Sequence, residues 1–465
     1  MLKAELCLTW SVDFNSEVCL GTLIAGCVNG WSAPALVKLQ SGDHIFNITS
    51  DQGSALALYS EIGHFFVPIP CGILADVFGR KPLFLMTSVA ALIGWGIISF
   101  GQTYLHYVIA RIILGFEFGS QCVLMTIYIA EISGKDVRGM FGSTSMFFLN
   151  VGVLFQFVIG SVFSISTTAV ITFALCILQI VLALFLVESP YFLVAAKQNE
   201  KAENNLMWLR AATSPAISDE FSSITQRVDV RENLFVSVKN LLSKTQYKGF
   251  VYCMIISFLG ELTGRVTVIT YASENFKTAD PSSAKLMTVL LGICNVVFPV
   301  MPIFLSDTVG RKIVIVISSI VAVSMHLISG LIYFLYLKMG VQLPWFQWLV
   351  FASIAGFQSS CSIYITNVLT LRGELIAENS RGFASGFSSM AFALAVFLAT
   401  KTFQIVRDCF GIYWGFWLLG SYTTLLGLFT WIFIPETKNR SFEDIQRRMY
   451  GDQLNEKVKE NSKLP

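Results

Sequence analysis

The sequence predicts an all-α membrane protein with twelve transmembrane helices, arranged as two pseudo-symmetric halves of six helices each. Three observations predict this fold. Of the 465 residues, 54% are hydrophobic and 13% are charged, with a mean hydropathy of +0.65, which is too apolar for a soluble protein of this size. The charged residues collect in short clusters between long apolar stretches. Several charged motifs also occur twice, about half a chain apart, which indicates a duplicated chain.

The apolar stretches have the length of membrane spans. A helix that crosses a bilayer needs about 20 mostly apolar residues, and glycine or proline inside such a helix is tolerated. By this measure the sequence predicts twelve spans, at 16–37, 54–78, 83–103, 106–131, 139–162, 166–187, 248–272, 284–306, 313–337, 345–371, 382–405 and 411–434.

The duplication is visible in three charged motifs that recur in the same order. The segment GILADVFGRK at 72–81 returns as IFLSDTVGRK at 303–312. A glutamate followed seven residues later by an arginine occurs after spans four and ten, and a further glutamate follows spans six and twelve. The residues concerned are Asp76, Gly79, Arg80, Lys81, Glu131, Arg138 and Glu188, and Asp307, Gly310, Arg311, Lys312, Glu374, Arg381 and Glu436. Repeats of this kind are typical of transporters built from two similar halves.

The polar segments divide the chain into four parts. We expect a first six-helix half at 1–190, a cytosolic linker with short helices at 191–247, a second six-helix half at 248–434 and a cytosolic tail at 435–465. The linker is rich in Lys, Glu, Asn and Ser and contains helical stretches such as EKAENNLMWLRA.

The distribution of Lys and Arg predicts the orientation. These residues concentrate after the even-numbered spans, and such segments face the cytosol. Both termini are therefore expected in the cytosol. We expect no cleaved signal peptide, because the first residues carry no small-residue cleavage site. Asn47 of the sequon Asn-Ile-Thr then falls in the first outside loop, where it is a candidate for glycosylation.

Other classes of protein are not indicated. The net charge of +2 is too small to suggest a nucleic-acid partner. The ten cysteines form no CxxC pair and the four histidines have no neighbour at ligand spacing, so we expect no metal and no cofactor. The sequence shows no nucleophile–base pair or phosphate-binding loop of an enzyme, and no repeated filter motif of a channel.

The duplicated motifs resemble those of the major facilitator superfamily, and within it those of the sugar porters. Asp-x-x-Gly-Arg-Lys stands after spans two and eight, Glu-Ser-Pro at 188–190 is similar to the family's Pro-Glu-Ser-Pro, and Pro-Glu-Thr stands at 435–437. SAPAL at 32–36 and TKTF at 400–403 resemble the branch of insect facilitated trehalose transporter-like proteins. The resemblance implies a facilitative carrier that moves a small solute by alternating access, a monomer, and the plasma membrane as its location.

The expected role of the charged motifs does not depend on which solute is carried. Arginine presents a planar fork that binds a carboxylate through two hydrogen bonds. We therefore expect two gating clusters at the cytosolic helix ends. The first consists of Asp76, Arg80, Arg111, Glu131, Arg138 and Glu188, and the second of Asp307, Arg311, Glu374, Arg381 and Glu436. The alternative is interfacial charge that serves topology alone.

The expected substrate positions depart from the sugar-porter pattern. Span seven reads GELTGRV at 260–266 where sugar porters carry Gln-Gln-x-Ser-Gly-x-Asn, and span ten reads ITNVL at 365–369 where they carry Gly-Pro-x-Pro-Trp. Sugar binding needs many hydrogen-bonding partners, so these losses weaken a standard sugar site. The polar candidates for substrate contact that remain are Asn150, Gln156, Thr263, Asn295 and Asn367.

Ionisable residues appear at membrane depth instead, and such residues usually mark a functional pathway. Glu261 and Arg265 are four residues apart and share a helix face. They form either a structural ion pair or part of a site for a charged solute. Glu61 and His64 are three residues apart in span two, where His64 either bonds a neighbouring helix or forms a proton relay with Glu61.

Three functions are compatible with this sequence. We predict a carrier of a small polar solute, a sugar such as trehalose or a hexose, working by alternating access. The alternatives are a transporter of another solute such as an organic anion, which Arg265 suggests, and a non-transporting, receptor-like protein with a degenerate sugar site.

Overall fold

The computed structural model describes residues 2–42, 44–133, 138–210, 214–229, 247–300, 310–341, 345–376, 381–438 and 444. Its side chains are described for these residues except 2–15, 138–140, 214–216, 227–229, 300, 373–374 and 381–382. Every regular element in the described residues is a helix. The chain forms two compact units, Met1–Glu232 and Asn233–Pro465.

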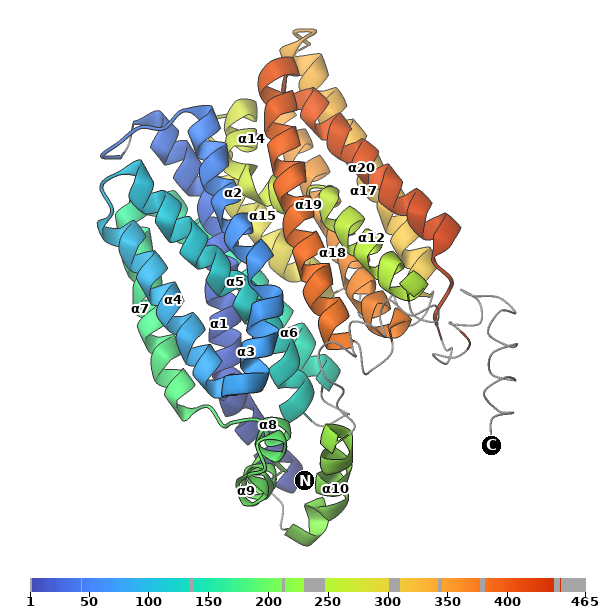
Figure 1. The fold of residues 1–465 in the computed structure, drawn as a ribbon. Coiled ribbons are helices and arrows are strands. Elements are labelled where there is room, and N and C mark those ends of the chain that lie inside the picture. Colours follow the sequence, from blue (N-terminus) through green and yellow to red (C-terminus); the bar gives the residue numbers. More distant parts are fainter. Residues whose placement is uncertain are drawn as a thin grey trace. The chain divides into compact units, whose positions relative to one another are not determined.

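The first unit is a bundle of long apolar helices. Its members are α1 (Leu2–Ser41), α2 (Ser50–Phe66), α3 (Pro68–Phe78), α4 (Arg80–Phe100), α5 (Tyr104–Ile132), α6 (Arg138–Val162) and α7 (Ile165–Phe185). Within it α1 packs along α6, α2 packs along α5, and α4 lies between α5 and α7 (Figure 1).

The second unit repeats this architecture. Its helices are α12 (Tyr247–Leu262), α13 (Arg265–Thr270), α14 (Ala272–Ala279), α15 (Ala284–Val297), the 3₁₀ turn η1 (Phe298–Val300), α17 (Arg311–Leu337), α18 (Phe346–Leu375), α19 (Arg381–Phe410) and α20 (Ile412–Phe433). Here α17 packs against both α18 and α20, and α12 packs against α19.

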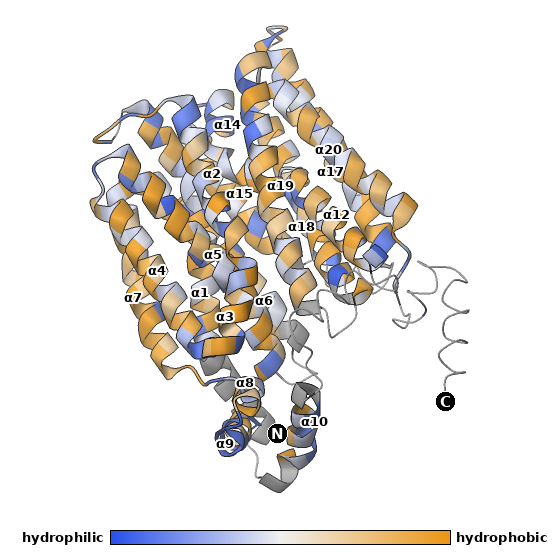
Figure 2. Cartoon of the chain, viewed as in Figure 1, coloured by the Kyte–Doolittle hydropathy of each residue, from blue (hydrophilic) through white to orange (hydrophobic). Residues whose placement is uncertain are grey.

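The helices confirm the predicted helical membrane protein. Among the described residues, ten helices are long and apolar enough to cross a membrane, and there are eleven spans if α2 and α3 form one span bent by 46°. The bend lies next to Pro68, the first residue of α3, as expected for a residue without a backbone N–H. Helix α15 occupies the start of the predicted span 284–306, whose last residues lie outside the described part. In both units the long helices consist largely of hydrophobic residues along their length (Figure 2).

A second predicted span is also not a continuous helix. The prediction placed a single helix at 248–272, whereas the structure ends α12 at Leu262 and starts α13 at Arg265. Gly264 lies between them with a φ of +91°, a left-handed conformation that glycine adopts without a steric penalty. Periodicity and hydropathy are averaged over longer windows than a break of one or two residues, so the break could not be predicted from them.

The predicted linker contains three short helices: α8 (Pro190–Ala195), α9 (Asn199–Arg210) and α10 (Ser214–Asp229). They share a small apolar core formed by Leu193, Val194, Ala202, Leu206, Ile217 and Ile224. Arg210 fastens them to the bundle, because its Nη1 donates to the carbonyl of Ile132 at 2.8 Å and its Nη2 to Glu220 at 2.8 Å. These helices therefore belong to the first unit.

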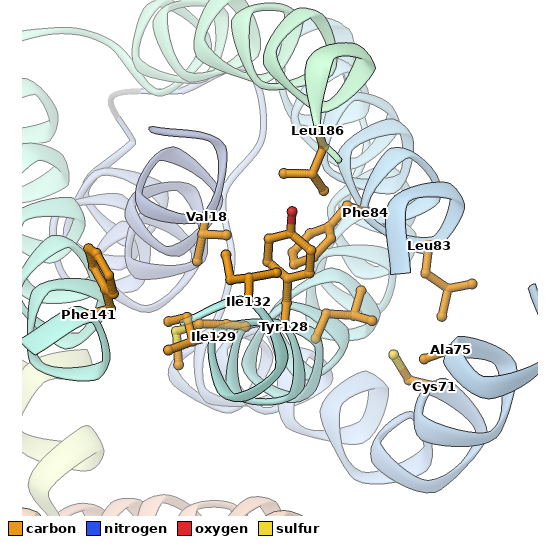
Figure 3. Packing of buried hydrophobic residues seen from close by; sticks show 12 residues of the cluster. Val18, Cys71, Ala75, Leu83, Phe84, Tyr128, Ile129, Ile132, Phe141 and Leu186 are labelled. Carbon is orange, nitrogen blue, oxygen red and sulfur yellow. The ribbon is translucent and has the colours of Figure 1, made fainter. Parts of the chain in front are cut away.

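An apolar cluster of the first unit lies at the end of α3, α4 and α5 that carries the repeated charges. It includes Val18, Ala75, Phe84, Tyr128 and Leu186 (Figure 3). Phe84 and Tyr128 meet edge to face with their ring centroids 5.4 Å apart, a favoured aromatic geometry. The cluster fixes the helix ends on which the charged residues stand.

Candidate functional site

Arg80 is the centre of the first charged cluster. Its side chain is fully buried, and its Nη2 donates to Asp76 at 3.0 Å and to Glu131 at 2.6 Å. Its Nη1 donates to the carbonyl of Ala75 at 2.9 Å, which also accepts the backbone N–H of Gly79 at 3.2 Å at the end of α3. Arg80 thus joins α3, α4 and α5 at one end of the bundle.

Glu188 completes this cluster by capping α4. Its carboxylate accepts hydrogen bonds from the backbone N–H of Arg80 at 2.9 Å and of Lys81 at 3.2 Å, which are free at a helix N-terminus and favour an anion. The Lys81 ammonium donates to the carbonyl of Leu184 at 2.7 Å. We call Asp76, Arg80, Glu131 and Glu188 the first-half cluster.

Gly79 permits this capping. Its φ is +97°, and an added Cβ would lie 2.5 Å from Glu188 Oε2. We expect Gly79→Ala to lower the free energy of unfolding by about 1–3 kcal/mol, the usual cost of a strained backbone position. Thermal unfolding of the purified protein measures this. Gly72→Ala is the matched control, because an added Cβ there meets nothing within 4 Å. Equal melting temperatures for the two variants would contradict the capping role.

The second unit repeats the same capping arrangement. Glu436 accepts hydrogen bonds from the backbone N–H of Arg311 at 3.1 Å and of Lys312 at 3.2 Å, as Glu188 does from Arg80 and Lys81. Gly310 has a φ of +109°, and an added Cβ would lie 2.8 Å from Glu436 Oε2. We call Gly310, Arg311, Lys312 and Glu436 the second-half cluster. Asp307 lies outside the described residues, as do the side chains of Arg138, Glu374 and Arg381.

Arg111 does not belong to the first-half cluster, which corrects the prediction. It lies in the second turn of α5, twenty residues and about 30 Å of helix from Glu131. Its guanidinium donates to the carbonyl of Val28 at 2.8 Å and the hydroxyl of Ser60 at 2.8 Å, and stacks over the ring of Trp31 at 5.2 Å. Arg111 therefore joins α1, α2 and α5 in the interior. The prediction grouped Arg111 with the cluster because it is an arginine. The length of α5 separates it from the end of the helix where the cluster lies.

Glu61 and His64 lie close together on α2. His64 Nδ1 is 3.4 Å from Glu61 Oε2, both side chains are buried, and the His64 ring meets Phe118 of α5 edge to face at 5.0 Å. The predicted juxtaposition is present, and a relay through it stays a prediction.

Glu261 and Arg265 form the ion pair that their spacing predicted. Arg265 Nη2 lies 3.2 Å from Glu261 Oε1, with the Glu261 side chain 2% exposed and the Arg265 side chain 19% exposed. The pair spans the break between α12 and α13. Arg265 is the more exposed member of the pair, and its buried Nε atom has no hydrogen-bond partner in the described residues.

The predicted amide candidates fall into two groups. In the first unit, the amide of Asn150 donates a hydrogen bond to the carbonyl of Met146 at 2.9 Å. The amide of Gln156 donates to the hydroxyl of Thr172 at 3.1 Å. In the second unit, Asn295 Nδ2 and Asn367 Oδ1 are buried and have no partner in the described residues. Gln156 Oε1 of the first unit is likewise buried without a partner, so both units offer unused hydrogen-bonding groups among the described residues.

Gln358 of α18 was missed by the sequence analysis. Its Nε2 donates to the carbonyl of Arg265 at 3.4 Å, and its buried Oε1 has no partner within the described residues. It stands in the polar run FQSSCS at 357–362, which is the signal that could have identified it in an apolar span.

The break in span seven is held by side chains of two neighbouring helices. His326 Nε2 of α17 lies 3.3 Å from the carbonyl oxygen of Thr263, which ends α12 without a helical partner. The Thr263 hydroxyl lies 2.5 Å from the Tyr364 hydroxyl of α18. These contacts, together with Gln358, position Glu261 and Arg265 on either side of the break.

We expect His326→Phe, which keeps the ring but removes the N–H donor, to lower the free energy of unfolding by about 1–3 kcal/mol, the cost of an unpaired buried carbonyl. His326→Gln, which retains a donor, should recover part of the loss. Chemical or thermal unfolding of the purified variants measures both. If His326→Phe is as stable as the wild type, the Thr263 carbonyl has another partner and the interpretation is wrong.

Comparison with known proteins agrees with this architecture. The model of the family "Sugar (and other) transporter" matches residues 18–449. The chain is 28% identical over 442 residues to the facilitated trehalose transporter Tret1 of Polypedilum vanderplanki, covering 93% of this chain and 87% of the relative. It is 26% identical over 439 residues to Tret1 of Drosophila willistoni, covering 94% of this chain. The matched part of this chain covers 50% of the length of the Drosophila willistoni relative.

Solved structures show the same fold. The xylose transporter XylE from E. coli, in an inward-open conformation, is similar with a TM-score of 0.78 and 20% sequence identity, covering 94% of this chain and 99% of that chain. The duplicated helical architecture, the repeated Glu-capped motifs and the family match over nearly the whole length lead to one conclusion: the chain belongs to the sugar (and other) transporter family.

Proposed function

We propose that this chain is a transmembrane carrier of a small polar solute, a sugar such as trehalose or a hexose, which it moves by alternating access. The observation that carries the proposal is the repeated capping geometry. Glu188 and Glu436 each accept two backbone N–H bonds from a Gly-Arg-Lys turn. The same device in two similar halves matches the inherited symmetry on which alternating access depends.

The two clusters are proposed to act as gates. Each fastens helix ends within its own unit by charge-assisted hydrogen bonds, which are about twice as strong as neutral ones. A conformation in which these helix ends separate must lose those bonds, so the clusters bias the equilibrium toward the conformation that keeps them. To shift the equilibrium, solute binding has to supply the free-energy difference between the two conformations.

A sugar is supported by the relatives and by the buried amides. The relatives are described as facilitated trehalose transporters, and the second unit offers free polar atoms on Asn295, Gln358 and Asn367. Each bond from a sugar hydroxyl to such a group contributes about 1 kcal/mol net. Glu261, Thr263 and Arg265 stand at the break of the same unit and are proposed to complete the site.

The second candidate is a carrier of an organic anion. The specific observation that favours it is the Arg265 side chain, which is 19% exposed and whose Nε has no partner in the described residues. Arginine binds carboxylates and phosphates well. Against it stands Glu261, whose carboxylate already neutralises Arg265 at 3.2 Å. An anion would have to displace this carboxylate.

The setting in the membrane is also a proposal. We infer a plasma-membrane monomer with both termini in the cytosol and no nucleic-acid partner. Asn47 is exposed in the loop after α1, which suits glycosylation on the outer side. That loop rests on α5, since His44 Nε2 and the Tyr107 hydroxyl are 2.9 Å apart, and burial lowers the pKa of His44.

Uptake of labelled trehalose and glucose into vesicles containing the purified full-length protein tests the proposal, with and without an inward proton gradient. Saturable uptake that the gradient does not change supports a facilitative sugar carrier. Stimulation by the gradient would implicate Glu61, His64 and Glu261. Uptake of a labelled organic anion but of neither sugar would favour the second candidate. Folded protein that takes up none of these would support the receptor-like alternative.

A further inference from the structure

The first unit buries a carboxylate beside two glutamines. Glu17 of α1 is 1% exposed, and Gln121 of α5 and Gln179 of α7 are fully buried. Gln179 Nε2 lies 3.5 Å from Glu17 Oε1. A Cβ added at Gly21, one turn after Glu17, would lie 2.2 Å from Gln121 Nε2 and 2.8 Å from Gln179 Nε2. Both amides therefore occupy the space over this glycine, and the three side chains form one polar site between three helices.

Four of the six polar side-chain atoms of this site make no hydrogen bond in the described residues. Glu17 Oε2, Gln179 Oε1 and both amide atoms of Gln121 are buried without a partner in the described part of the chain. Each buried polar atom left in this way costs about 1–3 kcal/mol. Four such atoms around one point indicate that the site holds a further component that satisfies them.

The charge of the site identifies that component as a cation. The titratable groups that face Glu17 are Cys19 on α1 and Tyr128 on α5, and neither carries a positive charge. Helix α7 contains only Cys176 as a titratable residue, and residues 141–162 of α6 contain none. The side chains of Asp13 on α1 and Arg138 on α6 lie outside the described residues. No lysine, arginine or histidine of the described residues bonds to Glu17. Burying an ionised carboxylate without a countercharge in such an apolar bundle costs much free energy. The site therefore requires one positive charge that neutralises Glu17.

A single proton meets every requirement. A protonated Glu17 Oε2 donates to Gln121 Oε1, and after a turn of the amides Gln121 Nε2 donates to Gln179 Oε1. Gln179 Nε2 already points to Glu17 Oε1, so the three side chains close a ring. A hard metal ion is a poorer fit, because it requires about six oxygen ligands and only three side chains meet here. We propose that Glu17 binds a proton and that the resulting ring fastens α1 to α5 and α7.

This proton site lies next to the first-half cluster. Val18, the residue after Glu17, belongs to the apolar cluster under Arg80, together with Tyr128 and Leu186 (Figure 3). The Tyr128 hydroxyl donates to the carbonyl of Val187 at 2.7 Å, immediately before Glu188. Loss of the proton leaves a charge that must be hydrated, which loosens the packing beneath Glu188. The stability of this end of the unit then depends on pH.

Infrared spectroscopy of the purified full-length protein tests the proposal directly. The wild type should show the carbonyl band of a protonated carboxylic acid that Glu17→Gln removes. Glu117→Gln, which changes another buried carboxyl of this unit, should leave that band in place. Thermal unfolding gives a second readout. From about pH 6 to about pH 9, the melting temperature of the wild type should fall more than that of Glu17→Gln, which keeps the ring without a proton. Glu17→Leu should melt lower than both at every pH.

A protonated-acid spectrum that Glu17→Gln does not change, or an equal pH dependence in wild type and Glu17→Gln, would overturn the proposal. If Glu17→Gln does not fold, Gln121→Leu provides the same test. It removes the acceptor of the Glu17 proton, so the band should shift to higher frequency, and an unshifted band would count against the ring. None of these measurements depends on transport.

Discussion

Arg80→Ala is expected to reduce solute uptake about tenfold, which corresponds to a change of 1.4 kcal/mol in the barrier. Arg80 bonds Asp76 at 3.0 Å and Glu131 at 2.6 Å, and its loss leaves the mostly buried Glu131 carboxylate without a countercharge. Removing one partner of a buried pair costs about 3 kcal/mol, which a domain with 5–15 kcal/mol of stability survives. The protein should therefore reach the membrane and transport slowly. Uptake divided by surface protein measures the effect.

Two further variants separate gating from general damage. Arg311→Ala alters the corresponding position of the second unit and should also slow uptake. Lys81→Ala removes only the exposed hydrogen bond to the Leu184 carbonyl and should have little effect, because exposed contacts contribute about 0–1 kcal/mol. Unchanged uptake in both arginine variants would show that the charged motifs serve topology and not gating.

The ion pair at the break of span seven should show strong coupling between its two members. If its role is structural, Glu261→Gln and Arg265→Gln each leave one buried charge unpaired and cost about 3 kcal/mol. The double variant removes both charges and should recover much of the folded yield. The coupling free energy from the double-mutant cycle, measured by unfolding, is expected at about 1–3 kcal/mol. If the pair binds solute instead, all three variants should fold and lose uptake to a similar degree.

A second ion pair in the same unit is the control for this cycle. Arg407 of α19 and Glu274 of α14 lie 2.5 Å apart with 13% and 15% of their side chains exposed. The cycle Arg407→Gln and Glu274→Gln should show structural coupling. Loss of uptake without loss of folded yield in that control as well would mean that the assay does not distinguish substrate contact from packing.

The helical fold was predictable because hydropathy alone encodes it. Long apolar runs must satisfy their backbone within each helix, so each predicted span has a helix, and the charge clusters mark the ends. The exceptions are local. The bend at Pro68 could be read from the proline. The break at Gly264 could not be predicted from the glycine, because many glycines lie inside unbroken membrane helices. The positive φ of Gly264 depends on contacts with neighbouring helices.

The site was predictable where partners are close in the sequence or repeated. Glu261 and Arg265 meet because four residues make one helical turn, and the role of Glu188 is mirrored by Glu436. Arg111 was misplaced because residue type does not say at which end of a helix a charge lies. Gln358 and His326 were missed because their partners, the carbonyls of Arg265 and Thr263, are backbone groups that become available only when the helix breaks.

The sequence by itself determined the class of protein, the order of the spans and the repeated charged motifs, since these depend on composition and short spacing. Only the tertiary structure decided which charges meet. It assigned Arg80 to two carboxylates, moved Arg111 into the interior and gathered Glu17, Gln121 and Gln179 from three helices. Contacts between residues a hundred positions apart are set by how helices pack side by side, and local spacing carries no information about that packing.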